Sequence, residues 1–240
     1  MDRNQLDRAL ERLTSRLGEL TGLNPCLVLY GSAARGDWVP GRSDVNVLLL
    51  VDDTSPTALR RLTPAVTEWH ASGFSPPLIM GRAEWDRSAD TFPIEITDMQ
   101  LSHRVLCGPD PVVGMKVDPA DLREAVEREL RGKLVRLRQA YVRFGEAGMI
   151  LGGFALASIA TYFALLRCTA ILYGREPGHQ PKETVAALGD RLGAAGEVAV
   201  EIASHRHKQE WHCPPEMFVR YMDLVRHTVE LIDTFQHGDH

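Results

Sequence analysis

Two oxygen-bearing side chains, Asp44 and Asn46, stand two positions apart in the stretch LYGSAARGDWVPGRSDVNVLLLV, residues 29–51. The apolar runs at the two ends of this stretch predict two β-strands joined by a turn and a polar loop. An extended chain points residues i and i+2 to the same face, so we expect Asp44 and Asn46 to face one site while Val45 enters the core. Carboxylate and amide oxygens are ligands that Mg²⁺ prefers. The spacing therefore predicts a Mg²⁺ site beside this strand.

The elements that would position this pair change in kind near residue 115. Before it, apolar runs bounded by turn residues predict strands at 26–30, 44–51, 77–81 and 92–99, with a helix at 57–70. After it, apolar residues recur every three or four positions from Leu122 to Phe144, which predicts one long amphipathic helix. Further helices are expected at about 150–173, 182–193, 195–208 and 214–236. The fold class is therefore α+β, with an α/β domain at 1–115 and a helical bundle at 116–240.

Composition excludes several classes of protein. The 240 residues are 44% hydrophobic and 25% charged, which is typical of a globular chain and not of a disordered one. The formal net charge is −5 and neither half is basic, so nucleic acid is not an expected partner. The N-terminus predicts an amphipathic helix and not a signal peptide, and the four well-separated cysteines fit reduced thiols, so a cytoplasmic location is expected.

One apolar run, residues 148–166, contains no charge and is long enough to cross a bilayer. Glycine, alanine, serine and threonine dilute it, and Arg167 follows at once. We expect a buried helix of the bundle here, and no membrane partner.

The order of these elements resembles the nucleotidyltransferase superfamily, the DNA polymerase β-like fold that also contains the aminoglycoside adenylyltransferases. The family signature is a Gly-Ser at the end of one strand, then Asp-x-Asp on the next strand, then a third acid on a later strand. Gly31 and Ser32 match the first part, Asp44 and Asn46 the second, and Glu95 the third. The resemblance implies a mixed sheet flanked by helices in which the Gly-Ser backbone approaches a triphosphate and the acids hold two Mg²⁺ ions.

The choice of Glu95 as the third acid depends on the strand predicted at 92–99. With a period of two, Glu95 and Thr97 share one face, while Ile94, Ile96 and Asp98 share the other. Glu95 is therefore the expected metal ligand or general base, and Asp98 ranks second.

A second resemblance to the same family lies in the segment YGREPGHQPKETVAALGDRL, residues 173–192. In the aminoglycoside adenylyltransferases a Pro-Lys opens a helix that faces the cleft, and Lys182 falls at the matching position. The resemblance implies a phosphate contact for Lys182. A solvated lysine behind Pro181, an ordinary first residue of a helix, is the alternative.

The amide at position 46 leaves three readings of the function open. Asn46 is nearly isosteric with aspartate but removes one of the three negative charges that would face the metals. The first reading is an enzyme that uses Mg²⁺ to transfer a nucleoside monophosphate from an NTP, with ATP as the expected donor, to a hydroxyl of an unknown small-molecule acceptor. The second is a degenerate nucleotidyltransferase, a pseudoenzyme that binds a nucleotide or a protein partner with little or no catalysis. The third is a ribonuclease of the helical half, with an Arg and a His at the spacings of 206–212 or 220–227. A homodimer stays open in each.

Overall fold

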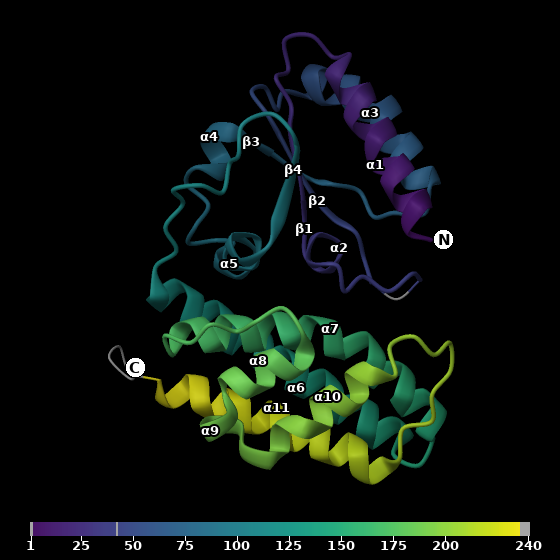
Figure 1. Cartoon of the computed structure of the whole chain (residues 1–240), viewed down its shortest axis with the longest axis vertical. Coiled ribbons are helices and arrows are strands. Elements are labelled where there is room, and N and C mark those ends of the chain that lie inside the picture. The colour runs from purple at the N-terminus through teal and green to yellow at the C-terminus, as the bar shows by residue number, and fades with distance from the viewer. Residues whose placement is uncertain (1, 42, 236–240) are drawn as a thin grey trace. The chain divides into compact units, whose positions relative to one another are not determined.

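The computed structural model describes residues 2–41 and 43–235, which form two compact units, Met1–Val117 and Asp118–His240. The first unit holds the β-structure and the second is helical (Figure 1). The α+β class expected from the sequence is confirmed.

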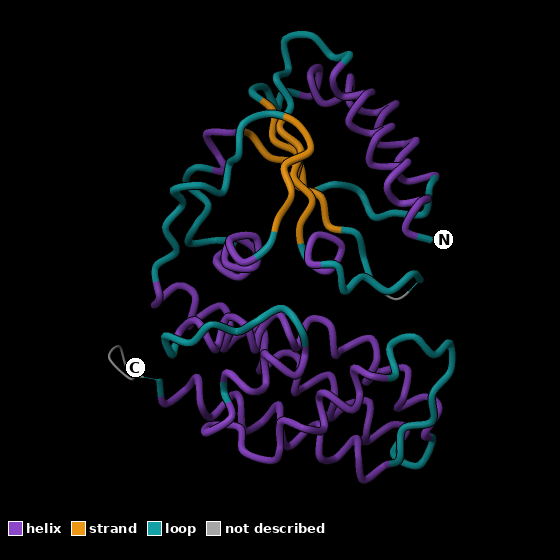
Figure 2. The backbone as a smooth tube through the Cα atoms, in the orientation of Figure 1, coloured by secondary structure: helices purple, strands orange, loops and turns teal. Residues whose placement is uncertain are grey.

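The described part of the first unit contains a four-stranded mixed sheet in the order β3-β2-β1-β4. Figure 2 shows its strands in orange. Its strands are β1 (Cys26–Tyr30), β2 (Asn46–Val51), β3 (Leu78–Gly81) and β4 (His103–Cys107). β1 pairs antiparallel with both β2 and β4, whereas β2 pairs parallel with β3. The predicted strands at 26–30, 44–51 and 77–81 are thus present, with β2 starting two residues later than expected.

Helices cover both faces of the sheet (Figure 1). α1 (Arg3–Gly18) and α3 (Pro56–Ala71) lie on one side, where the core includes Leu29, Val45 and Val47. α4 (Arg82–Trp85) and α5 (Pro93–Leu101) lie on the other side. That second core is built from alternate strand residues together with apolar residues of the two helices, among them Val28, Leu48, Leu50, Trp85, Ile96 and Met99. Both faces of β1 and β2 are buried, which explains their nearly continuous apolar sequence.

The strand predicted at 92–99 is wrong, because residues 93–101 form helix α5. Pro93 lies in the first turn, where a missing N–H loses no hydrogen bond of the helix. Glu95 lies in the same turn, where the helix dipole stabilises a carboxylate. Ile96 and Met99 are three residues apart and both fully buried, so a helical face fills the core. The strand that follows, β4, was not expected from the sequence.

The second unit consists of helices within its described residues. Three are long: α6 (Pro119–Phe144), α7 (Gly148–Leu172) and α11 (Pro215–Thr234). Shorter ones connect α7 to α11, namely α8 (Pro181–Ala187), α9 (Gly189–Leu192), the 3₁₀ turn η1 (Gly193–Gly196) and α10 (Glu197–Ser204). The long helix predicted from Leu122 to Phe144 is α6.

α7 is the helix that the apolar run predicted, and it packs against α6, α8, α10 and α11. Among the described helices it is the one whose length and mean hydropathy of 2.0 would suit a membrane span. Half of its most apolar window is buried inside the unit. A buried core helix meets the same criteria, so the absence of a membrane partner stays a prediction.

Candidate functional site

The turn after β1 brings the side chain of Asn46 onto the backbone of Gly31. Asn46 opens β2 and pairs with Tyr30, the last residue of β1. Gly31 follows with φ +71° and ψ −153°, a conformation that side-chain-bearing residues avoid. A Cβ built on Gly31 would lie 2.8 Å from Asn46 Nδ2. Glycine is therefore needed here for two reasons, the backbone conformation and the closeness of the amide.

Asp44 and Asn46 keep the alternation that the sequence implies. Val45 and Val47 are buried in the core under α1 and α3. Asp44 is exposed and Asn46 is half-buried. Along β2, Asn46 alternates with Val47 and so shares the face of Leu48, the face that α5 covers. An oxygen ligand at position 46 thus lies at the edge of the α5 side of the sheet.

Ser32 begins a single helical turn, α2 (Ser32–Arg35), directly after Gly31. The carbonyl oxygen of Gly31 accepts hydrogen bonds from the amides of Ala34 and Arg35, at 3.1 and 3.0 Å. The first amides of a helix, here those of Ser32 and Ala33, have no acceptor within the helix. Donors of this kind beside a glycine are suited to an anionic ligand.

Glu95 reaches the same end of the sheet from a helix and not from a strand. It is half-buried in the first turn of α5. Burial, with the negative charges of Glu95 and Asp98 adding to it, raises the pKa of Tyr30 to about 12. Glu95 and Asp98 are three residues apart on one helix and so lie on neighbouring positions of its surface, which corrects their expected placement on opposite faces.

Asp98 has a structural partner, the buried guanidinium of Arg35. Arg35 Nη1 donates to both carboxylate oxygens of Asp98 at 3.0 and 2.9 Å, and Arg35 Nε lies 3.4 Å from Asp37 Oδ1. The side chains of Arg35 and Asp98 are 6% and 11% exposed. This ion-pair network fixes α2 to α5 and was not expected from the sequence, since 63 residues separate its two halves.

The donor set fits a metal that a ligand brings with it better than a metal held by protein alone. Within residues 2–41 and 43–235, no three His, Cys, Asp or Glu side chains are grouped to hold a metal ion. The amide at position 46 is not one of these residue types, and rotation of that amide exchanges Nδ2 and Oδ1 at the site. Asp44 and Asn46 can offer two oxygens, which suits a Mg²⁺ ion that keeps waters and phosphate ligands.

Two further residues, Lys182 and Trp38, lie elsewhere or serve packing. Lys182 is exposed at the second position of α8, in the second unit, so its phosphate contact stays a prediction. Trp38, in the loop before Asp44, packs against the core under α1 and α3 and donates from Nε1 to the carbonyl of Ser43 at 2.9 Å.

The Arg–His pairs of the ribonuclease reading lie in the second unit. Arg206 is buried while His212 is exposed. His227 Nε2 lies 2.7 Å from the carbonyl oxygen of Arg191, and Arg220 is exposed on the same helix as His227.

Comparisons with known proteins were made at the level of families and of single sequences. No family model matches the chain. Over 60 residues the chain is 32% identical to the CCA-adding enzyme of Pyrobaculum aerophilum, a nucleotidyltransferase. The match covers 25% of this chain and 13% of that enzyme, so the chain spans a small fraction of its relative. The likeness therefore points to the nucleotidyltransferases over one segment and leaves substrate and acceptor to inference.

Proposed function

We propose that the first unit binds a nucleoside triphosphate with Mg²⁺ at the turn between β1 and β2 and transfers its nucleoside monophosphate to a hydroxyl of a small-molecule acceptor. The observation that carries this proposal is the contact between Asn46 and Gly31, with Asp44 exposed beside it. It supports a site in which the side-chain oxygens of Asp44 and Asn46 would be available beside a glycine turn that a polyphosphate can approach closely. The partial similarity to a CCA-adding enzyme supports the same class of reaction.

Each residue of the site has a role in this proposal. The amides at the start of α2, with Ser32, bind the triphosphate. Asp44 and Asn46 hold the Mg²⁺ that the nucleotide carries, and ATP is the expected nucleotide. Glu95 acts as a further metal ligand or as the general base for the acceptor hydroxyl. The phosphate contact of Lys182 stays a prediction of the family resemblance.

The metal ion supplies charge neutralisation for the phosphates and activation of the acceptor hydroxyl. With Asn46, the protein offers the carboxylates of Asp44 and Glu95 and one neutral oxygen. An ion with its own phosphate ligands tolerates this loss of charge. An ion that depends on protein oxygens is weakened more, and a loss of about 3 kcal/mol in transition-state stabilisation slows a reaction about a hundredfold.

The same amide favours a second candidate function, a degenerate nucleotidyltransferase that binds a nucleotide without turnover. This candidate differs from the first in the fate of the ligand and not in its position. Both require that Mg²⁺-nucleotide binds at the turn between Gly31 and Asn46.

The test compares the wild-type protein with Asn46→Asp. Mg²⁺-dependent release of pyrophosphate is measured for each NTP with a panel of hydroxyl-bearing acceptors, and nucleotide binding is measured by calorimetry. Asn4→Asp is the matched control, because Asn4 is exposed on α1 of the same unit and the change in charge is identical.

Equal turnover by the wild type and Asn46→Asp supports the enzyme. Turnover that appears only in Asn46→Asp, and not in Asn4→Asp, supports the degenerate protein. Absence of nucleotide binding by both the wild type and Asn46→Asp overturns both candidates.

A further inference from the structure

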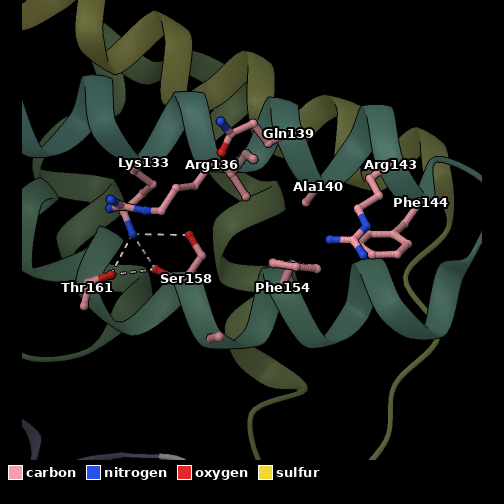
Figure 3. A pocket seen from close by; sticks show the side chains of 11 residues that line it. Lys133, Arg136, Gln139, Ala140, Arg143, Phe144, Phe154, Ser158 and Thr161 are labelled. Atoms are coloured by element: carbon pink, nitrogen blue, oxygen red, sulfur yellow. Dashed lines mark hydrogen bonds between the residues drawn. The ribbon is translucent and has the colours of Figure 1, made fainter.

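A groove runs between α6 and α7 in the second unit. Its volume is about 400 Å³, which falls within the range of small-molecule sites. Figure 3 shows its two different ends, with Lys133, Arg136, Ser158 and Thr161 at one and Arg143, Phe144 and Phe154 toward the other. Leu137, Ala140 and Ala157 line the part between them.

The first end is cationic and holds a buried ammonium. Lys133 is only 5% exposed. Its Nζ donates to the carbonyl oxygen and the hydroxyl of Ser158, at 3.0 and 3.2 Å, and to the hydroxyl of Thr161 at 2.6 Å (Figure 3). All three partners are uncharged, although buried charges in proteins are usually paired with an opposite charge.

Arg136 adds a second positive charge to this end. Burial lowers the pKa of Lys133, the positive charge of Arg136 lowers it further, and the negative charge of Glu129 raises it by a smaller amount. Within the described part of the chain, Lys133, Arg136 and Arg143 form no ion pair. Two cations that repel each other at one end of a cavity are an arrangement that a bound anion stabilises.

The second end is aromatic. The rings of Phe144 and Phe154 stack with centroids 6.0 Å apart and an interplanar angle of 27°. The guanidinium of Arg143 lies 4.9 Å from the centroid of Phe144. Phe154 is 41% exposed, so part of its ring is open to a ligand.

We propose that the α6–α7 groove binds a small organic anion, with its acidic group at Lys133 and Arg136 and its apolar or aromatic body against Phe154 and Phe144. The acid is a carboxylate or a phosphate. This binding site belongs to the second unit and does not depend on the nucleotide chemistry proposed for the first.

The spacing of the helix sets the size of the ligand. Phe154 and Ser158 are one turn apart on α7, a rise of about 6 Å. A ring that stacks on Phe154 is therefore two or three carbon atoms from an acid that reaches Lys133 beside Ser158. The apolar walls and the two cations disfavour a cationic ligand at this place.

The test measures binding to the full chain by calorimetry with three probes. Phenylpropionate and phenylethyl phosphate carry the acid at the required distance, and phenylpropanamide is the neutral analogue. We expect one or both acids to bind and the amide to bind at least about tenfold more weakly. The comparison of the two acids distinguishes a carboxylate site from a phosphate site.

Three variants assign the binding to the groove. Lys133→Met is expected to weaken the binding of the acids by about tenfold or more, and Phe154→Ala to weaken it by a similar factor. Arg138→Gln is the matched control, because Arg138 is exposed on α6 but does not line the groove. It should leave the affinity within about twofold of the wild type.

Several results would overturn the proposal. These are equal affinity for the acids and the amide, unchanged affinity in Lys133→Met, an equal loss in Arg138→Gln, or no binding of either acid at millimolar concentration. Circular dichroism of each variant shows whether it is folded. If Lys133→Met fails to fold, Phe154→Ala, which changes a half-exposed side chain, decides the question.

Discussion

Replacement of Lys133 by methionine is expected to stabilise the helical unit. Burial lowers the pKa of Lys133 to about 8, from 10.5, and the positive charge of Arg136 adds to this effect. The protonated form of this side chain is thus less stable in the native protein than in the unfolded chain. Ser158 and Thr161 keep hydrogen-bond partners after the replacement, because the Thr161 hydroxyl also donates to the carbonyl of Ser158 and the Ser158 hydroxyl also contacts Tyr221.

The magnitude follows from the gap between the two pKa values. The gap corresponds to about 3 kcal/mol of unfavourable free energy when the side chain is protonated in both states. Loss of the ammonium's hydrogen bonds to neutral groups offsets about 1 kcal/mol of this. Lys133→Met is therefore expected to raise the free energy of unfolding by about 2 kcal/mol at about pH 7.

The pH dependence gives the prediction its sign. Between the native pKa of about 8 and the unfolded value of 10.5, the unfolded chain binds more protons than the native protein. The stability contributed by this group therefore rises with pH, and the cost of the charge falls from about 3 to about 1.4 kcal/mol between about pH 7 and about pH 9.5. The advantage of Lys133→Met should shrink over the same interval and nearly vanish.

The assay is urea unfolding followed by circular dichroism across that pH range, for the wild type and Lys133→Met. Lys208→Met is the control, since Lys208 is exposed in the same unit. It should show no comparable gain and no narrowing with pH. A variant at position 133 that is less stable than the wild type near neutrality, or a difference that is independent of pH, would refute the reasoning.

Two further predictions concern the first unit. Gly31→Ala should cost about 2 kcal/mol of stability and abolish nucleotide binding, because the new Cβ strains the backbone and displaces Asn46. Gly36 also has a positive φ but has open space around it. Gly36→Ala should therefore cost about 1 kcal/mol of stability and keep nucleotide binding. Calorimetry and urea unfolding check both, and equal effects of the two variants would contradict the role of Asn46. Arg35→Met should cost about 3 kcal/mol, because it leaves the buried carboxylate of Asp98 without its cation. Asp98→Asn in the same chain should recover part of that loss in a double-mutant cycle of unfolding free energies, and simple additivity would argue against the pair.

The strands and the turn around Gly31 were predictable because their signals are local. β1 and β2 are nearly continuous apolar runs, and the glycine, the serine and the polar loop stand between them. The alternation of Asp44, Val45 and Asn46 follows from the geometry of an extended chain alone. Information of this kind lies within about ten residues of each position.

α5 and β4 were missed because their local signals are ambiguous. Residues 92–99 alternate polar and apolar side chains over a span too short to separate a period of two from a period of 3.6. Pro93 and Glu95, in the first turn of the helix, carried the deciding information. β4 is at the edge of the sheet, and its burial is incomplete, with Arg104 exposed, so its sequence lacks the apolar run of an inner strand.

The ion pair of Arg35 with Asp98 and the surroundings of Lys133 lay beyond sequence reasoning for a different reason. Each joins residues that are far apart in the chain, 63 residues in the first case and 25 in the contact of Lys133 with Ser158. An arginine in a polar loop and a lysine in a charged helix look like solvated side chains in a linear reading. Their burial is a property of the tertiary structure and has no local signal.

The two candidate sites have opposite charge, and this explains why the charge of the whole chain says little about its ligands. The site proposed at the end of the sheet includes the carboxylates of Asp44 and Glu95, while Arg35 is paired with Asp98. A site of this charge would need a cation before it could accept a polyphosphate, and Mg²⁺ has that part in the proposed function. The α6–α7 groove is the converse, because Lys133, Arg136 and Arg143 form no ion pair within residues 2–41 and 43–235 and so suit an anion directly. A formal charge of −5 averages these two environments, although ligand binding depends on each of them separately.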